Sequence, residues 1–286
     1  MGSALVSFLR QGGHEVVCIG RRKYGRWDIT WEELRRQPAL LAGAKVLVNL
    51  AGERIDQRWT RATVARIRES RVGTTRLLAE VAATVAPKPS VLLAGSAVGI
   101  YGDRGDEVLD ENSAPGNGFL AELAVEWEGA AEPARVAGIR VVHPRLGIVL
   151  HPQGGVLRRL LPVFRLGLGG PVGSGRQWMS WIARTDAVAA LVWLAQDSDI
   201  HGPVNVVAPA PVTNAEFART LARVLRRPSV LHVPALAIWL LYGRMGRETV
   251  LAGQRVLPRR LMEGGFRFRC PDLESALRNE LRAAGL

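Results

Sequence analysis

Short apolar runs alternate with amphipathic stretches over the first 150 residues of the chain. The runs predict buried strands, and the stretches between them, with apolar residues at helical spacing, predict helices. The expected strands are residues 14–19, 45–50, 91–95 and 139–142, and the expected helices are residues 3–10, 64–84 and 119–136. Strands that alternate with helices at this spacing predict an α/β fold with a doubly wound, mostly parallel, Rossmann-like sheet.

The alternation loosens after residue 150. A glycine-rich loop at residues 167–175 is followed by two expected helices, residues 185–196 and 214–225, with a short strand at 203–207 between them. The sequence contains no internal repeat and no clear linker. We therefore expect a smaller carboxyl-terminal α/β lobe that packs against the sheet and forms a cleft with it.

Composition excludes several classes of protein. With 286 residues, 48% hydrophobic and 22% charged, the chain is long and apolar enough for a substantial core, which excludes a disordered tail and a fibre. Of its 38 basic residues three are lysines, so 35 arginines carry almost all of the net charge of +12. These arginines are scattered, without a basic arm or an aromatic-rich strand, so we expect no nucleic-acid partner.

Cysteine and histidine usage excludes other kinds of site. Cys18 and Cys270 are too few for a disulfide framework or a structural zinc site, and the histidines meet no metal-ligand spacing, so we expect no metal. A reducing, cytoplasmic location is the expectation. The longest apolar stretch, residues 230–242, is too short to cross a bilayer, and we expect no membrane partner.

The residues that follow the predicted strands carry the candidate chemistry, because ligands of a doubly wound sheet bind at the carboxyl ends of its strands. Gly20, Arg21 and Arg22 follow the first predicted strand. An acidic residue there would bind the 2′-hydroxyl of NAD, whereas guanidinium groups suit the 2′-phosphate of NADP. The pattern favours NADP(H) over NAD, and a solvated turn is the alternative.

Small residues and hydroxyls follow the next two predicted strands. Leu50, Ala51 and Gly52 let a ring or a ribose approach the backbone, unless they only make a tight turn. Ser96 and Tyr101 place a hydroxyl and a phenol at the expected mouth of the cleft, although an ordinary cap and a packed aromatic are the alternatives. The neighbouring acidic pairs, such as Asp110 and Glu111, are expected to be solvated in a loop.

The order of these motifs resembles the extended short-chain dehydrogenase/reductases, and more narrowly their epimerase-like branch. The runs that carry the resemblance are Gly13-His14-Glu15-Val16-Val17, Asn49-Leu50-Ala51-Gly52, Ser96-Ala97-Val98-Gly99-Ile100-Tyr101-Gly102, Arg145-Leu146-Gly147-Ile148-Val149-Leu150 and Gly173-Ser174-Gly175-Arg176-Gln177-Trp178-Met179-Ser180-Trp181. With further runs at residues 205–209, 213–217 and 254–273, the resemblance covers nearly the whole chain.

The resemblance implies a domain organisation and a set of further site residues. It implies an NAD(P)-binding domain at residues 1–150, a substrate lobe at 151–234 and a family-specific module at 235–286. The further cofactor-binding residues would be Gly2, Arg71, Arg145, Leu146 and Gly147, and the substrate wall would contain Gln177, Trp178 and Trp181. Solvation of Arg71 and packing of the tryptophans between lobes are the alternatives.

Two departures from the family pattern change what the resemblance implies. The chain opens inside the first helix, with Gly2 as the last glycine of the expected Gly-x-x-Gly-x-x-Gly turn, so we expect that a central strand of about a dozen residues is missing before it. The Tyr-x-x-x-Lys dyad is absent, since Ile19, Leu41 and Thr84 stand four residues before the three lysines, and Phe119 and Leu123 occupy the matching helix.

Two hypotheses on function follow. The first is an NADP(H)-dependent oxidoreductase or epimerase that acts on a small molecule, with Ser96 as the group that orients the substrate and Tyr101 or water as the proton donor. The second, motivated by the missing dyad, is a catalytically inert sensor or scaffold that binds NADPH. The sequence leaves a homodimer open.

Overall fold

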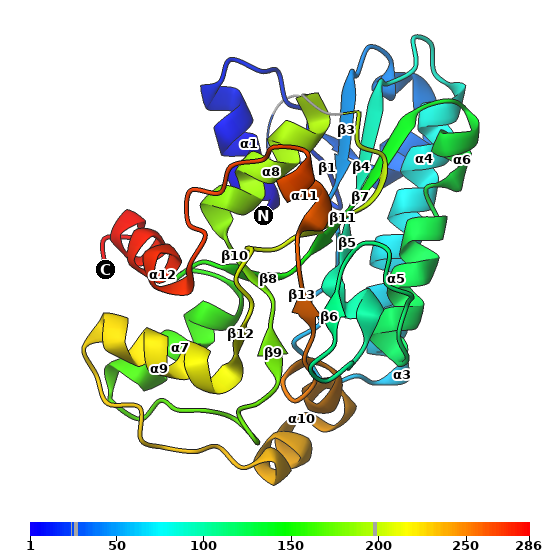
Figure 1. The fold of residues 1–286 in the computed structure, drawn as a ribbon. Helices are drawn as coiled ribbons and strands as arrows, with labels where there is room; N and C mark the ends of the chain where they lie inside the picture. Colours follow the sequence, from blue (N-terminus) through cyan, green and yellow to red (C-terminus); the bar gives the residue numbers. More distant parts are fainter. Residues whose placement is uncertain (24, 26–27, 197–198) are drawn as a thin grey trace.

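A parallel sheet forms the centre of the first lobe. The computed structural model describes residues 1–23, 25, 28–196 and 199–286. The strands of this sheet are β3 (Val46–Asn49), β4 (Val91–Ala94), β5 (Ser96–Ala97), β7 (Arg140–Leu146) and β11 (Gly202–Val206). They lie in the order β11-β7-β4-β3, with β5 beside β7, and every neighbouring pair is parallel (Figure 1). The predicted α/β fold with a mostly parallel sheet is confirmed.

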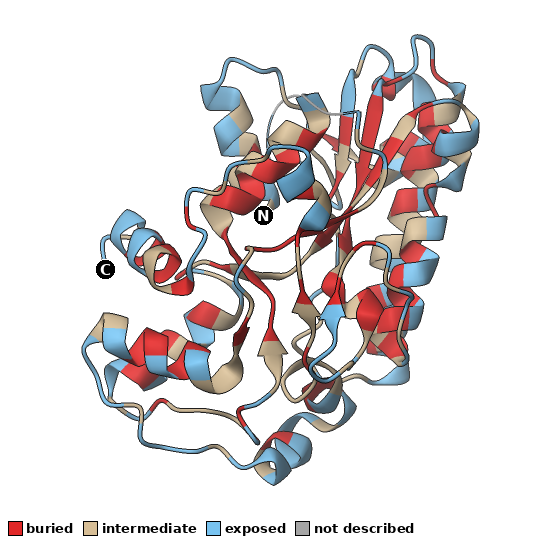
Figure 2. Cartoon of the chain, viewed as in Figure 1, coloured by how far each residue is buried: buried red, intermediate tan, exposed pale blue. Residues whose placement is uncertain are grey.

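Both faces of this sheet are covered, because successive side chains of a strand point to opposite sides. Leu92 of β4 packs with Leu78 of α4 (Thr74–Thr84) on one face. Leu93 packs on the other face with Leu191 of α8 (Arg184–Gln196) and Leu5 of α1 (Gly2–Gln11). Figure 2 shows the buried residues concentrated along the strands and on the inner sides of these helices. The arrangement is the doubly wound one that the sequence predicts.

The first predicted strand is mostly wrong. Only Ile19–Gly20 form a strand, β1, which pairs in parallel with β2 (Ile29–Thr30) as a separate two-stranded sheet. Cys18 accepts one backbone hydrogen bond from Ile29 of β2, but residues 14–17 pair with no strand in the described part of the chain, and apolar side chains alone do not make a strand without a hydrogen-bonded neighbour. Within the same described residues β3 pairs only with β4, and the expected strand before Gly2 stays a prediction.

Two predicted helices are interrupted. Residues 61–84 form α3 (Arg61–Arg68), a π-helical turn (Glu69–Gly73) and α4. The predicted helix 119–136 is divided into α5 (Phe119–Gly129) and α6 (Glu132–Val136). Pro133 explains the second interruption, because its nitrogen carries no hydrogen to donate to the carbonyl one turn earlier.

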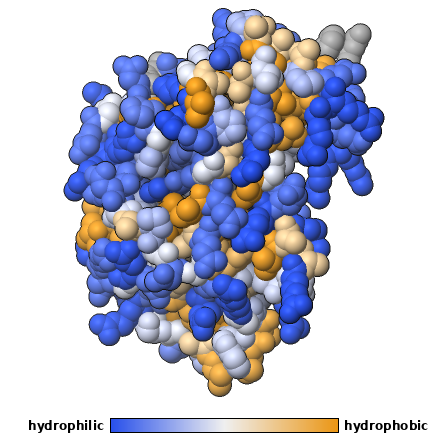
Figure 3. Space-filling model, turned by 90° about the vertical axis from the view of Figure 1, so that its right-hand side faces the viewer, coloured by the Kyte–Doolittle hydropathy of each residue, from blue (hydrophilic) through white to orange (hydrophobic). Residues whose placement is uncertain are grey.

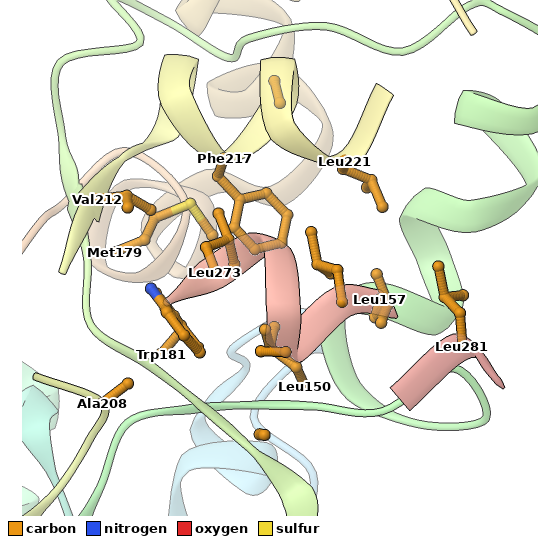
Figure 4. Close-up of a cluster of buried hydrophobic side chains, with 14 of the residues drawn as sticks. Leu150, Leu157, Met179, Trp181, Ala208, Val212, Phe217, Leu221, Leu273 and Leu281 are labelled. Carbon is orange, nitrogen blue, oxygen red and sulfur yellow. The ribbon is translucent and has the colours of Figure 1, made fainter. Parts of the chain in front are cut away.

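The second lobe has its own apolar core. It contains β8 (Ile148–Leu150), α7 (Gly155–Arg165), β9 (Trp178–Met179), β10 (Trp181–Ala183), β12 (Val212–Thr213), α9 (Asn214–Leu225) and α12 (Leu273–Ala283). Leu157, Trp181, Phe217 and Leu273 meet in this core (Figure 4). The predicted helix at 214–225 is confirmed as α9. The strand predicted at 203–207 is β11, which begins and ends one residue earlier and belongs to the central sheet, not to the second lobe.

The remaining elements connect the lobes or lie at their edges. They are α2 (Trp31–Arg36), β6 (Val108–Leu109), α10 (Ala235–Thr249), β13 (Arg255–Val256) and α11 (Arg259–Glu263), with 3₁₀ turns at Pro38–Leu41 and Val98–Tyr101. β13 pairs with β6, so a carboxyl-terminal segment returns to the first lobe. In the described part of the chain, no helix combines the length and apolarity needed to span a bilayer.

We predict that Trp181→Ala destabilises the protein by about 3 to 5 kcal/mol, because the fully buried indole fills the core of the second lobe. Trp239→Ala is the matched control, since Trp239 is more than half exposed, and it should change stability by about 0.5 kcal/mol or less. Urea unfolding followed by circular dichroism measures both variants. Equal losses of stability would contradict the assignment of Trp181 to the core.

Candidate functional site

The carboxyl ends of β3, β4 and β7 lie at one edge of the sheet, because these strands are parallel neighbours. Leu50–Gly52 follow β3, Ser96 follows β4, and Gly147 follows β7. The turn after β1 lies beside the same edge, since Nη1 of Arg21 is 3.8 Å from Oε2 of Glu53. The structure therefore brings the strand-end motifs found in the sequence to one edge.

Asn49, the last residue of β3, holds the Leu50–Gly52 turn in place. Its Nδ2 donates to Oγ1 of Thr75 at 2.8 Å, and its Oδ1 accepts from the backbone N of Ala51 at 3.0 Å. The indole nitrogen of Trp127 also donates to Oγ1 of Thr75, which ties α5 to the same point. Sequence reasoning gave Asn49 no role of its own, although a polar residue at the end of an apolar strand was the available signal.

Arg71 lies directly beneath that turn. Its Nη1 donates to the backbone oxygen of Glu53 at 3.0 Å, and its guanidinium lies over the Trp127 ring, 5.2 Å from the centroid. A Cβ at Gly52 would be 2.9 Å from Cζ of Arg71, so a larger residue there would displace the guanidinium from its present position. Burial lowers the pKa of Arg71, with Glu53 opposing the shift. Within the described residues Nη2 has no hydrogen-bond partner, which leaves donors for an anion.

A buried ion pair joins β7 to α5. Arg145 makes a two-bond contact with Glu128, from Nε to Oε1 at 2.8 Å and from Nη2 to Oε2 at 2.9 Å. Ser96 donates its hydroxyl proton to Oε1 of the same carboxylate at 2.7 Å. Arg145, predicted to flank a cofactor, and Ser96, predicted to orient a substrate, thus share one carboxylate partner.

Tyr101 extends this network to the last strand of the sheet. Its hydroxyl accepts from Nη1 of Arg145 at 2.9 Å and donates to Oδ1 of Asn205 at 2.8 Å. Nδ2 of Asn205 donates in turn to the backbone oxygen of Leu257 at 3.0 Å. One chain of hydrogen bonds therefore runs from Ser96 to the carboxyl-terminal segment.

The expectation that Glu111 is solvated is wrong. Its side chain is buried, because Oε1 accepts from the backbone nitrogen of Asn205 at 2.9 Å and from that of Arg260 at 3.3 Å. Burial raises the pKa of Glu111, and these two bonds oppose the shift. No hydrogen-bond partner of Oε2 lies among the described residues.

Ser96 and Tyr101 are both buried, and each donates its hydroxyl proton to a protein group rather than toward solvent. Burial raises the pKa of the Tyr101 phenol, and the Arg145 charge opposes this only in part. The structure thus holds Tyr101 as a neutral phenol at neutral pH. The catalytic roles expected of the two residues stay predictions.

Gly147 and Leu146 both have packing roles in this structure. A Cβ at Gly147 would lie 2.5 Å from the backbone oxygen of Ser180 and 2.6 Å from Cγ1 of Val207, so only glycine fits there. Leu146 packs with the apolar cluster around α8. Their predicted contact with a cofactor stays a prediction beside this structural role.

The three residues of the predicted substrate wall lie in different surroundings. Nε2 of Gln177 donates to the backbone oxygens of Val172 and Val250. Trp178 is half-buried; its Nε1 donates to Asp106 at 2.7 Å, and Arg255 lies over its ring. Trp181 is fully buried in the core, which is the packing alternative to a substrate contact.

A pocket of about 540 Å³ lies at the amino end of α1, the helix that Gly2 begins. Ser3, Ile148, His151 and Arg184 are among the residues that line it. The first turn of α1 carries no acidic residue, so the helix dipole and Arg184 both favour an anion at this end. Across the described residues, no cluster of three or more histidine, cysteine or acidic side chains could hold a metal ion.

We predict that His143, which lies on β7 beside this network, makes the free energy of unfolding depend on pH. Burial lowers the pKa of its imidazole below the usual 6.5, with Glu128 opposing. The unfolded chain then binds this proton more readily than the folded one, so the free energy of unfolding falls as the pH drops below about 6.5. Urea unfolding between about pH 7.5 and 5.5 should show a shallower fall for His143→Gln. An equal fall in the free energy of unfolding for the unaltered protein and for His143→Gln would refute this contribution, since the other titrating groups are common to both proteins.

Comparison with known proteins places this geometry in a family. The sequence profile described as "NAD dependent epimerase/dehydratase family" matches residues 1–207, and a domain of unknown function, DUF1731, matches residues 233–280. Epimerase family protein Mb2239 of Mycobacterium bovis is 42% identical over 281 residues, which covers 97% of this chain and 93% of the relative. Human epimerase family protein SDR39U1 is 38% identical over 287 residues, with 97% and 95% coverage.

A solved structure resembles this protein in both fold and sequence. The crystal structure of human SDR39U1 with NADPH matches with a TM-score of 0.91 and 35% identity, and the match covers 98% of this chain and 95% of that one. UDP-glucose 4-epimerase of Thermotoga maritima matches with a TM-score of 0.77 at 17% identity, which shows the fold alone. This chain belongs to the NAD dependent epimerase/dehydratase family, of the extended short-chain dehydrogenase/reductase type.

Proposed function

We propose that this protein binds NADPH and is an oxidoreductase or epimerase that acts on a small molecule. The observation that carries the proposal is the pair Arg21 and Arg22, which directly follows the carboxyl end of β1. The Arg21 side chain is 89% exposed, and its only acidic neighbour among the described residues is Glu53 at 3.8 Å. Two exposed guanidinium groups at this position suit the 2′-phosphate that distinguishes NADPH from NADH.

Other residues at the same edge fit the rest of a dinucleotide. The amino end of α1 suits a pyrophosphate, because a helix amino terminus offers backbone N–H donors without a partner in the helix, and the pocket lined by Ser3 and Arg184 lies at this end. Gly52 suits the adjoining ribose or phosphate, and so does Nη2 of Arg71, for which the described residues supply no hydrogen-bond partner. When bound, a nicotinamide cofactor supplies or accepts a hydride. The human relative that was crystallised with NADPH supports this choice of cofactor.

Because the Tyr-x-x-x-Lys dyad is missing, catalysis would need other polar groups. Phe119 and Leu123, which stand where the resemblance places the dyad, are buried against Ile67 in an apolar cluster. No phenol or ammonium can therefore act from that face of α5. We propose that Ser96 and Tyr101 are instead the polar groups that position the substrate, with a proton transferred through Tyr101 or water.

A catalytically inert, NADPH-binding sensor is the second candidate function. The apolar pair on α5 favours it, and so does the engagement of both hydroxyl groups with protein acceptors, since neither proton is directed at a ligand. The two candidates share the cofactor and differ only in turnover. Turnover assays therefore distinguish them.

We predict that Arg21→Ala/Arg22→Ala weakens NADPH binding by about 10- to 100-fold and leaves NADH binding unchanged, because each charge-assisted contact to the phosphate contributes about 1 to 3 kcal/mol. Titration calorimetry measures both ligands. Arg61→Ala is the matched control, since Arg61 is exposed on α3 and has no ion-pair partner among the described residues. Equal weakening for both cofactors would contradict selection by the 2′-phosphate.

We predict that Ser96→Ala and Tyr101→Phe each lower NADPH oxidation by at least about 100-fold while the affinity for NADPH stays the same. The assay uses the small-molecule fraction of a cell extract as substrate. Ser90→Ala and Tyr242→Phe, both on exposed residues, are the controls.

Two other results have defined meanings. A rate that neither variant changes would remove both residues from the mechanism. If the protein binds NADPH but forms no product from any fraction, the catalytically inert sensor becomes the better account of its function.

A further inference from the structure

The first half of α10 exposes large apolar side chains with nothing packed over them. Leu240 and Leu241 are 68% and 71% exposed, and Trp239 is 54% exposed. Only Ile238 in this half faces the protein. Gly243, with φ 55°, ends the apolar half and redirects the chain into the basic second half.

A neighbouring segment enlarges this apolar surface. Leu166 and Leu168 at the end of α7 are also exposed, and so are Val230 and Leu231, which precede α10. The two segments lie side by side, because a Cβ at Gly167 would be 3.2 Å from Pro228 and Val172 pairs with Val233. Figure 3 shows apolar side chains gathered at the end of the molecule where Figure 1 places α10. We call this surface the apolar tip.

Arginines outnumber acidic residues in two sequence ranges that include the segments of the apolar tip. Residues 151–185 and 217–247 contain eleven arginines, no lysine and no acidic residue. They carry a formal charge of +11, out of +12 for the whole chain. The remaining 220 residues are almost neutral in sum. Within the two ranges, Arg159 pairs with Asp56 and Arg184 lines the pocket at the amino end of α1, so the other arginines supply the charge near the tip.

Several of these arginines are not neutralised locally. Arg223 pairs with Glu274, and Arg244 pairs with Glu248. Within the part of the chain that the structure describes, Arg165, Arg226 and Arg227 have no acidic partner; Arg165 directly precedes Leu166, and Arg226 and Arg227 lie four and three residues before Val230. The apolar tip is therefore bordered by exposed, unpaired positive charge.

We propose that the apolar tip binds the surface of a bilayer that contains anionic lipids. Leucine side chains with a tryptophan and a tyrosine suit the boundary between headgroups and acyl chains, and the surrounding guanidinium groups suit lipid phosphates and carboxylates. A second copy of this chain would bring two surfaces of like charge together, which disfavours self-association through this face. The expectation of no membrane partner rested on the absence of a spanning segment, and a surface contact needs none.

Sedimentation with lipid vesicles tests the proposal on the full chain. Vesicles of phosphatidylcholine with about 30% phosphatidylserine should carry the protein into the pellet, and vesicles of phosphatidylcholine alone should not. Leu240→Ser/Leu241→Ser should weaken binding to the anionic vesicles at least about tenfold through lost apolar burial. Arg226→Gln/Arg227→Gln should weaken it by a similar factor, because each arginine near the surface strengthens binding about fivefold.

Matched variants make the result specific to this surface. Val136→Ser removes an equally exposed apolar side chain from α6, and Arg61→Gln/Arg76→Gln removes two exposed charges from α3 and α4. Both controls should bind the anionic vesicles like the unaltered protein, and all variants should keep the same melting temperature. The proposal fails if the protein stays in the supernatant, if it binds neutral vesicles equally, or if the controls lose as much binding as the tip variants.

Discussion

The carboxyl ends of β3, β4 and β7 lie at one edge of the sheet, which we call the strand-end edge. The buried contact between Arg145 and Glu128 is the interaction on which the arrangement of this edge depends. Neither side chain reaches water to any large extent, and both nitrogen–oxygen distances are below 3 Å. Removal of one partner would leave a buried charge without compensation, which costs about 3 to 5 kcal/mol. Through Ser96 and Tyr101 the pair ties β5 and the turn at Val98–Tyr101 to β7 and α5, and through Asn205 it reaches β11 and the carboxyl-terminal segment.

The two ends of the strand-end edge differ in how their polar groups are used. Around Arg145 nearly every donor and acceptor is paired within the protein, so this end is rigid and holds a neutral phenol. Around Gly52 the cations Arg21 and Arg71 keep donors available for an anion. This division supports cofactor binding at the Gly52 end, as proposed. The hydroxyl groups that could act on a substrate, those of Ser96 and Tyr101, already donate to protein acceptors. Turnover would therefore require at least one of these hydrogen bonds to be exchanged.

The sequence predicted the features that depend on local patterns. Apolar runs identified β3, β4 and β7, helical spacing identified α9, and the order of motifs identified the family. It failed where a partner distant in the chain decides the outcome. Among the described residues, 14–17 have no strand to pair with, and Glu111 is buried where the backbone nitrogens of Asn205 and Arg260 donate to it. The pairing of Arg145 with Glu128 and the burial of Trp181 depend in the same way on tertiary contacts that no local pattern reports.

Thermal unfolding of the chain with NADPH, with NADH and with neither ligand tests the central claim most directly. A ligand present at about 100 times its dissociation constant stabilises the folded state by about 2.7 kcal/mol, which is a shift of a few degrees for a chain of this size. The account predicts one cooperative transition that NADPH raises and that NADH at the same concentration raises less. A transition that neither cofactor moves, or that both move equally, would contradict an NADPH site built around Arg21 and Arg22.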